Sequence, residues 1–159
     1  MKKIINFKYK RGFTLLELLL VVAAIAILAT IVFAVLSPAD TLNKFRDTNR
    51  LSNIQAIESA MALYAIDNGG DVPNKSDWST STPLTICGNT DHNASCDLDL
   101  TDLTNNSKYM IEVPSDPSVS VGSNSSGYEA IIDSNGLVVI SAPLASTGTI
   151  EAKGKFNPL

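Results

Sequence analysis

Glu17 is the first residue whose surroundings suggest chemistry, because it stands alone at the start of an apolar stretch. The run from Leu18 to Leu36 holds no charged residue, and Thr30 is its only polar one. An ionised carboxylate near a membrane is costly unless a cation pairs with it. Cleavage after Gly12 would create such a cation, the α-amino group of Phe13, which is largely protonated at neutral pH. The alternative places Glu17 at the cytoplasmic interface of a membrane, where a carboxylate also suits a helix N-terminus.

Two cysteines form a second chemical group, in a segment from Asn74 to Ser107 that is rich in Asn, Asp, Ser and Thr. Cys87 and Cys96 are the only cysteines of the chain, and an exterior compartment favours a disulfide over free thiols. The alternative is a metal site that adds His92, the only histidine. Structural zinc sites normally use four well-spaced ligands, and this group lacks both the number and the spacing. We therefore expect a disulfide and no metal ion.

Three aspartates of the same segment could suggest a calcium site. Around Asp97, Asp99 and Asp102, however, the glycine and the distal bidentate glutamate of an EF-hand loop are missing. We expect a solvated acidic loop instead. The chain also contains no Gly-x-Ser-x-Gly, no His-Glu-x-x-His and no glycine-rich phosphate loop. The sequence therefore predicts neither an enzyme nor a cofactor site.

The N-terminal segment, residues 1–12, reads as a cytoplasmic leader peptide. It carries five basic residues and no acidic one, so the positive-inside rule keeps the N-terminus in the cytoplasm. Residues 13–36 follow as a membrane helix, whose stretch from Leu18 to Leu36 would be about 28 Å long, close to the roughly 30 Å of a bilayer's hydrocarbon. A secretory signal would instead have a shorter apolar region with its cleavage site after it. Cleavage at Gly12 would remove the charges and keep the helix.

The order of residues from Lys10 to Glu17 is specific: two basic residues, a glycine, a phenylalanine and a glutamate four residues later. With the apolar run behind it, this order resembles the class III signal of type IV pilins and of the pseudopilins of type II secretion systems. The resemblance implies cleavage between Gly12 and Phe13 by an inner-membrane prepilin peptidase, and N-methylation of Phe13. It also implies that Glu17 pairs with the N-terminus of a neighbouring subunit when the assembly machinery builds a homo-oligomeric helical filament.

The apolar helix is expected to continue as an amphipathic half, residues 37–68. Pro38 predicts a kink or a local break near Leu36, after which Asp40 could cap the resumed helix. Apolar residues then recur at mostly three- and four-residue steps, which predicts one buried face. They are Leu42, Phe45, Leu51, Ile54, Ile57, Met61 and Tyr64. The glycines and the proline after Asn68 predict the helix end.

Residues 69–159 are expected to form an exterior head with a disulfide loop at 87–96. The segment from Asn74 to Ser107 predicts a long surface loop with a short strand or helical turn, held down by Trp78 or Leu84. Strands are predicted at 109–113, 128–132 and 137–141, the last two joined in a hairpin, with an edge strand at 149–152. The expected fold is α+β, a long helix packed against a small antiparallel sheet, and the order of these elements is similar to pilin heads.

The resemblance favours a structural filament subunit, with a cytoplasmic N-terminus and exterior head before assembly and a place on the cell surface afterwards. Removal of the leader would leave seven basic residues against 16 acidic ones, a formal charge of −9. So acidic a surface argues against nucleic acid as a main partner. Two alternatives stay open: a pseudopilin of a type II secretion system, and a membrane-anchored extracellular binding module that is not cleaved at Gly12.

Overall fold

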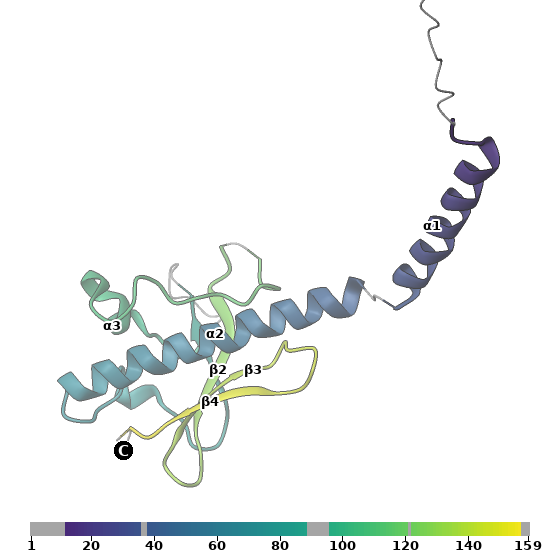
Figure 1. The fold of residues 1–159 in the computed structure, drawn as a ribbon. Coiled ribbons are helices and arrows are strands. Elements are labelled where there is room, and N and C mark those ends of the chain that lie inside the picture. The colour runs from purple at the N-terminus through teal and green to yellow at the C-terminus, as the bar shows by residue number, and fades with distance from the viewer. Residues whose placement is uncertain (1–11, 36–37, 89–95, 121, 157–159) are drawn as a thin grey trace, which may run out of the picture. The chain divides into compact units, whose positions relative to one another are not determined.

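The computed structural model describes residues 12–35, 38–88, 96–120 and 122–156. The chain divides into two compact units, Met1–Thr41 and Leu42–Leu159. The first contains helix α1 (Leu15–Val35) and the start of helix α2 (Pro38–Asp67). The second contains the rest of α2, a sheet and several short helices, and we call it the head (Figure 1). The break expected near Leu36 falls on residues 36–37, which lie outside the described residues.

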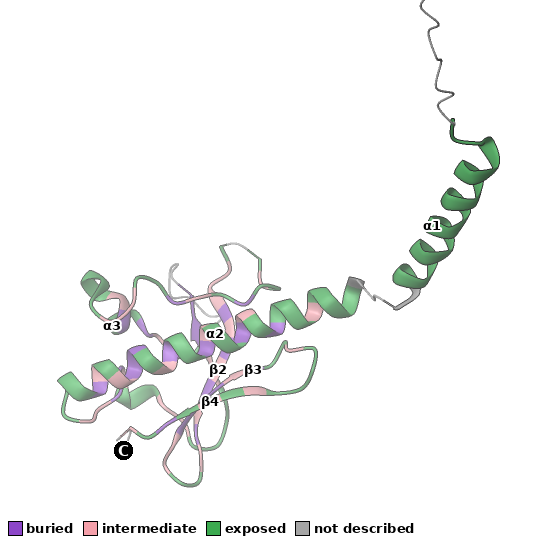
Figure 2. Cartoon of the chain, viewed as in Figure 1, coloured by how far each residue is buried: buried purple, intermediate pink, exposed green. Residues whose placement is uncertain are grey.

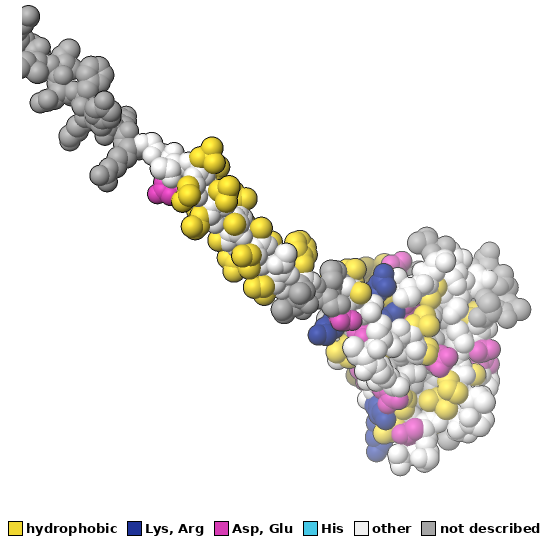
Figure 3. All heavy atoms as spheres, turned by 90° about the vertical axis from the view of Figure 1, so that its right-hand side faces the viewer, with side chains coloured by type: hydrophobic (Ala, Val, Ile, Leu, Met, Phe, Trp, Pro, Cys, Tyr) yellow, Lys and Arg dark blue, Asp and Glu magenta, His cyan; other side chains and the backbone are white. Residues whose placement is uncertain are grey.

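Helix α1 is apolar and exposed on every side. All side chains from Leu15 to Phe33 are exposed, as Figure 2 shows along the helix. Hydrophobic side chains cover the face of α1 that Figure 3 turns to the viewer. By length and composition, the span Leu15–Phe33 is able to cross a membrane. None of this span is buried within the chain, and so large an exposed apolar surface is typical of an interaction site.

One face of α2 forms the floor of the head. Ile54, Ile57 and Met61 recur at three- and four-residue steps, which places them on one side of the helix. All three are fully buried, in one cluster with Tyr128 and Ile140 of the sheet. Figure 1 shows α2 crossing the sheet, and the shared cluster shows that this helix packs on one face of it.

The end of α2 follows the sequence closely. The helix ends at Asp67, and Gly69 and Gly70 follow with φ values of 70° and 102°. The Gly70 N–H donates to the carbonyl of Ala65 at 2.7 Å, which satisfies a carbonyl of the last turn. Glycine adopts these left-handed conformations without a steric penalty. The chain therefore leaves the helix at the position that the two glycines predict.

The predicted buried face is wrong in the first half of α2. Three of its apolar residues are exposed by 40% or more: Leu42, Phe45 and Leu51. Two charged residues that the sequence placed between them, Asp47 and Arg50, are buried instead. They are tolerated there because they pair with each other and, through Arg50, with Asp116.

Four strands form one antiparallel sheet in the order β1-β2-β3-β4. The strands are β1 (Leu84–Cys87), β2 (Ser125–Ile132), β3 (Val138–Ala142) and β4 (Ile150–Gly154). Buried and half-buried residues alternate along β2, as expected for a strand with one face on the core. The expected hairpin is confirmed: Ile132 pairs with Val138 across a turn in which the carboxylate of Asp133 accepts the N–H groups of Asn135 and Leu137. The α+β fold class is also confirmed.

The strand expected at 109–113 is not present. Its place in the four-stranded sheet is taken by β1, which pairs with β2. The N–H groups of Tyr109 and Met110 both donate to the carbonyl of Leu103, at 3.3 and 3.1 Å, which folds this segment back toward the short helix α3 (Thr101–Thr104). The ring of Tyr109 then meets that of Tyr64 edge to face, with centroids 5.4 Å apart. Packing onto α2 therefore replaced pairing in the sheet.

The segment from Asn74 to Ser107 is more structured than a loop. Besides β1 and α3 it holds two 3-10 helices, η1 (Lys75–Asp77) and η2 (Asn105–Ser107). Trp78 and Leu84 pack against the core, as expected, and the Trp78 indole N–H donates to the carbonyl of Pro73 at 2.8 Å. These anchors hold the segment against the head.

Candidate functional site

The first turn of α1 is closed by a reciprocal pair of hydrogen bonds between Thr14 and Glu17. The Thr14 carbonyl accepts the first helical bond, from Leu18, so Thr14 caps the helix. The Thr14 hydroxyl accepts the Glu17 N–H at 3.2 Å, and Glu17 Oε2 accepts the Thr14 N–H at 3.1 Å. Glu17 Oε2 lies 3.1 Å from the Thr14 hydroxyl as well. This is a capping box, which satisfies two N–H groups that a helix start leaves open.

The capping box leaves part of Glu17 available. All its side-chain bonds to described residues involve Oε2, so Oε1 makes none among them, and the side chain is exposed. Gly12, Phe13, Thr14 and Glu17 line one surface hollow, and Phe13 is 80% exposed. The structure thus brings together the three residues that the sequence singled out, and it adds Thr14. The spacing Thr-x-x-Glu is a sequence signal for that addition.

The expected disulfide is present between Cys87 and Cys96, with Cα atoms 5.1 Å apart. It joins the end of β1 to the chain before α3, beside a parallel bridge between Ile86 and Leu98. A bonded pair of cysteines is not available as zinc thiolates, so the metal reading of this group is wrong. His92 lies outside the described residues.

Asp97, Asp99 and Asp102 lie in the described segment that leads into α3. Asp97 Oδ2 accepts the N–H of Thr85 at 3.0 Å, and Asp99 Oδ1 accepts the N–H of Thr101 at 2.7 Å. Two of the three carboxylates therefore hold the local backbone. Within the described parts of the chain, no group of three His, Cys, Asp or Glu residues is placed to hold a metal ion.

Arg50 lies at the centre of a buried polar cluster in the head. Its Nε and Nη2 donate to the two oxygens of Asp116 at 2.6 and 3.0 Å, a bidentate arrangement. Its Nη1 donates to Asp47 Oδ1 at 2.7 Å, and Nη2 also donates to the hydroxyl of Ser118 at 2.7 Å. Arg50 and Asp116 are only 1% and 2% exposed. The bond to Asp116 raises the pKa of Arg50, which stays charged.

Asp47 fastens the loop between β3 and β4 to α2. Its Oδ2 accepts the N–H and the hydroxyl of Thr147 at 3.0 and 2.7 Å, and its Oδ1 accepts the N–H of Ser146 at 3.1 Å. The Thr147 hydroxyl bond is the largest of the effects that lower the pKa of Asp47 to about 2. At Asp116 burial opposes ionisation, but the bonds from Arg50 and Ser118 outweigh it and lower the pKa.

The buried cluster is a structural clamp. Among the described residues, no buried side-chain nitrogen or oxygen lacks a hydrogen-bond partner. The bonds of Arg50, Asp47 and Asp116 connect α2 with two loops, the one that holds Asp116 and Ser118 and the one between β3 and β4. One weak sequence signal indicates this cluster, the three-residue spacing of Asp47 and Arg50 on a helix.

Comparison with known families assigns the N-terminal segment. Residues 7–33 match the family model described as the prokaryotic N-terminal methylation motif. The match covers Gly12, Phe13, Glu17 and nearly all of α1. No curated protein and no solved structure matches the chain significantly.

Proposed function

We propose, on the premise that this chain carries the class III signal of type IV pilins and pseudopilins, that it is the precursor of a pilus filament subunit. A peptidase of the inner membrane would cut between Gly12 and Phe13, and the new N-terminus would be methylated. Subunits would then polymerise through α1. The observation that carries the proposal is the capping box with an exposed Glu17 at the start of a helix that is apolar and exposed on all sides.

The position of the cut suits the geometry of the helix start. Cleavage before Phe13 leaves the Thr14 amide intact, so the bond from its N–H to Glu17 survives processing. The new α-amino group of Phe13 would lie at the positive end of the helix dipole, where a cation is disfavoured. A carboxylate from a second copy would relieve that repulsion. Glu17 is exposed at the same helix end in every copy, and this supports pairing between neighbours.

Burial of α1 would supply most of the association energy outside the membrane. Each Å² of apolar surface removed from water contributes about 25 cal/mol, and every side chain from Leu15 to Phe33 is exposed in the single chain. In such an apolar interior an unpaired charge costs several kcal/mol. The pair between Glu17 and the Phe13 amine would therefore fix the register of helices that apolar contact alone leaves free to slide.

The features of the head favour a pilus subunit displayed on the cell surface over a pseudopilin of a type II secretion system. The segment from Asn74 to Ser107 carries a disulfide and its own short elements, which suits exposure outside the cell. The subunit would be a single-pass membrane protein with its N-terminus in the cytoplasm before assembly, and part of a surface filament afterwards. The methylation motif marks a structural class of protein, so we propose no catalytic role for the head.

The test is the N-terminus of the protein isolated from cells. We expect a mature chain that begins with methylated Phe13, read by mass spectrometry, and a full-length chain for Gly12→Leu. A Cβ atom added at Gly12 has no neighbour within 4 Å in the protein itself, so lost processing would report on the peptidase. A wild-type protein that keeps its leader in cells with prepilin peptidase would refute the proposal. A Gly12→Leu chain that is still shortened would refute the cleavage site.

A further inference from the structure

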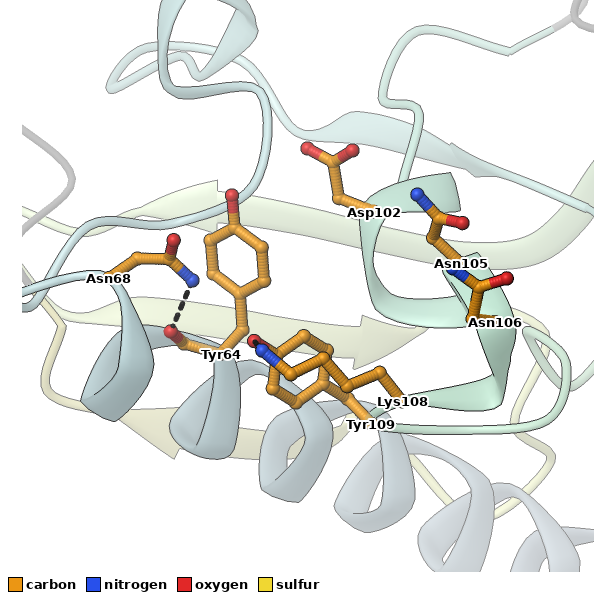
Figure 4. A pocket seen from close by; sticks show the side chains of 7 residues that line it. All are labelled: Tyr64, Asn68, Asp102, Asn105, Asn106, Lys108 and Tyr109. Atoms are coloured by element: carbon orange, nitrogen blue, oxygen red, sulfur yellow. Dashed lines mark hydrogen bonds between the residues drawn. The ribbon is translucent and has the colours of Figure 1, made fainter.

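A polar hollow lies on the head between the last turns of α2 and the segment of α3 and η2. Figure 4 shows Tyr64 and Asn68 on one side and Asp102, Asn105 and Asn106 on the other. Lys108 and Tyr109 complete the lining. The hollow belongs to one compact unit and is separate from the α1 site. Neither the methylation motif nor the filament proposal gives it a role.

The positive charge of Lys108, on one side of the hollow, is already paired within the protein. Lys108 Nζ lies 2.9 Å from Asp67 Oδ2, donates to the Tyr109 hydroxyl at 2.6 Å, and sits 4.6 Å from the centre of the Tyr109 ring. The Tyr109 hydroxyl in turn donates to Asp67 Oδ2 at 3.0 Å. The ammonium group therefore occupies a face of this ring and has its own counter-ion. Because its charge is already paired, Lys108 would attract an added anion only weakly. Its ammonium group also blocks an organic cation from stacking on that face of Tyr109.

Of the remaining side chains around the hollow, only Asn68 has a printed hydrogen bond within the described part of the chain: its amide donates to the Tyr64 carbonyl at 2.8 Å, as Figure 4 shows. Among the described residues, the Tyr64 hydroxyl, the Asp102 carboxylate and the side-chain amides of Asn105 and Asn106 have no hydrogen-bond partner. Tyr64 is half-buried, and its ring is braced edge to face against Tyr109. Asn106 has a left-handed backbone, φ 55°. Asparagine tolerates this conformation better than most residues. Asn105 and Asn106 both belong to the single turn of η2 that lines the hollow.

These groups match the chemistry of a sugar. A sugar hydroxyl both donates and accepts. The free groups supply amide donors, amide and carboxylate acceptors, and the Tyr64 hydroxyl, which can do either. The C–H face of a pyranose ring can pack on an aromatic ring, whose face carries negative potential. Asp102 is the one unpaired charge in the lining, so an anionic ligand is repelled. We propose that the hollow between Tyr64 and Asn105 binds a neutral saccharide unit.

The test measures saturation transfer by NMR from the full chain, held in a polyoxyethylene detergent that carries neither sugar nor ammonium groups. The probes are methyl glycosides of glucose, galactose and mannose, and N-acetylglucosamine, each at millimolar concentration, with choline beside them. We expect transfer to at least one saccharide and none to choline. Asn105→Ala and Tyr64→Phe each remove hydrogen-bonding groups from the lining, and we expect affinity to fall roughly three- to tenfold for each.

Gln55→Ala is the matched control, because it removes an exposed amide from another part of α2. We expect this variant to bind as the wild type does. Trp78 fluorescence, read in the same samples, verifies that each variant is folded. No transfer to any saccharide, equal transfer in Asn105→Ala and Gln55→Ala, or transfer to choline alone would each overturn the proposal. Filaments can form in all three cases, so this failure would be distinct from failure of the filament proposal.

Discussion

The two carboxylate oxygens of Glu17 differ in their partners. Oε2 is held by Thr14, while Oε1 has no partner among the described residues. The two readings of Glu17 at the sequence level, a helix-start residue and an assembly residue, are therefore compatible. The first is visible in the geometry, and the second stays a proposal.

Replacing Glu17 by Gln tests the charge apart from the shape. Glutamine can still accept the Thr14 N–H, so the helix start is expected to persist. The pair with the Phe13 amine would lose its anion, and a buried unpaired amine costs several kcal/mol. We expect normal leader removal by mass spectrometry and at least a tenfold drop in filaments sedimented from sheared cells. Normal filament yield would contradict the pairing model.

Replacing Thr14 by Val tests the positioning of Glu17. Valine keeps the size of threonine but removes the hydroxyl that accepts the Glu17 N–H, a loss of about 1 kcal/mol for a helix cap. We expect filament yield to fall less than in Glu17→Gln, since the charge remains. Thr14→Ser retains the hydroxyl and is the control that should restore yield. Equal yields for the valine and serine variants would show that the capping box does not orient Glu17.

At the scale of elements, α2 is held to the head by charge at one end and by apolar packing at the other. Arg50→Met should leave Asp47 and Asp116 buried without their cation, which costs about 3–5 kcal/mol. Urea unfolding of the full chain in detergent, followed through Trp78, measures the change in the free energy of unfolding. Arg46→Met is the control: Arg46 is exposed, and the expected change is below about 0.5 kcal/mol.

A second substitution sharpens this prediction. Replacing both partners of a buried ion pair by apolar residues is often nearly neutral, whereas removing one leaves a charge stranded. We expect Arg50→Met combined with Asp116→Leu to cost less than the sum of the two single changes. Additive costs would show that the two side chains do not act as a pair.

The elements that the sequence predicted well are those that local chemistry decides. The hairpin of β2 and β3 follows from two apolar runs joined by the turn from Asp133 to Gly136, and the end of α2 follows from Gly69 and Gly70. The failures involve partners distant in sequence. Arg50 is buried because of Asp116, 66 residues away, and no helical pattern contains that information.

The same distinction between local and distant partners explains why the strand predicted at 109–113 does not form. Its residues have strand-forming composition, but Tyr109 finds Tyr64 on α2, 45 positions earlier, and the strand position beside β2 is filled by β1. At the N-terminus, by contrast, Gly12, Phe13 and Glu17 are close in sequence, so their proximity could be predicted. Thr14 could have been predicted as well, from the Thr-x-x-Glu spacing that closes the capping box.

For the whole molecule, the two units differ in how their apolar side chains are buried. The head has its own core, a disulfide and a buried ion cluster, and it needs no second chain to satisfy its described buried polar groups. Helix α1 contributes no residue to the described core, and its side chains from Leu15 to Phe33 are all exposed. This division of labour suits a subunit whose head stays folded in the membrane-anchored and in the assembled state alike.

The acid stability of the head follows from its carboxylates. Folding lowers the pKa of Asp47 to about 2 and also lowers those of Asp67, Asp116 and Asp133. An unfolded aspartate titrates near pH 3.9, so below about pH 4 the unfolded chain binds protons that the folded head does not. The stability from these groups is therefore fully present above about pH 5 and is lost as the pH falls from about 4 to 2.

We expect the urea midpoint to be flat from pH 7 to 5 and to drop below pH 4. In Asp47→Asn the midpoint should start lower and fall less steeply in acid, because one of the depressed groups is gone. A midpoint that stays flat or rises between pH 4 and 2 would show that these four carboxylates do not stabilise the folded head in their ionised form.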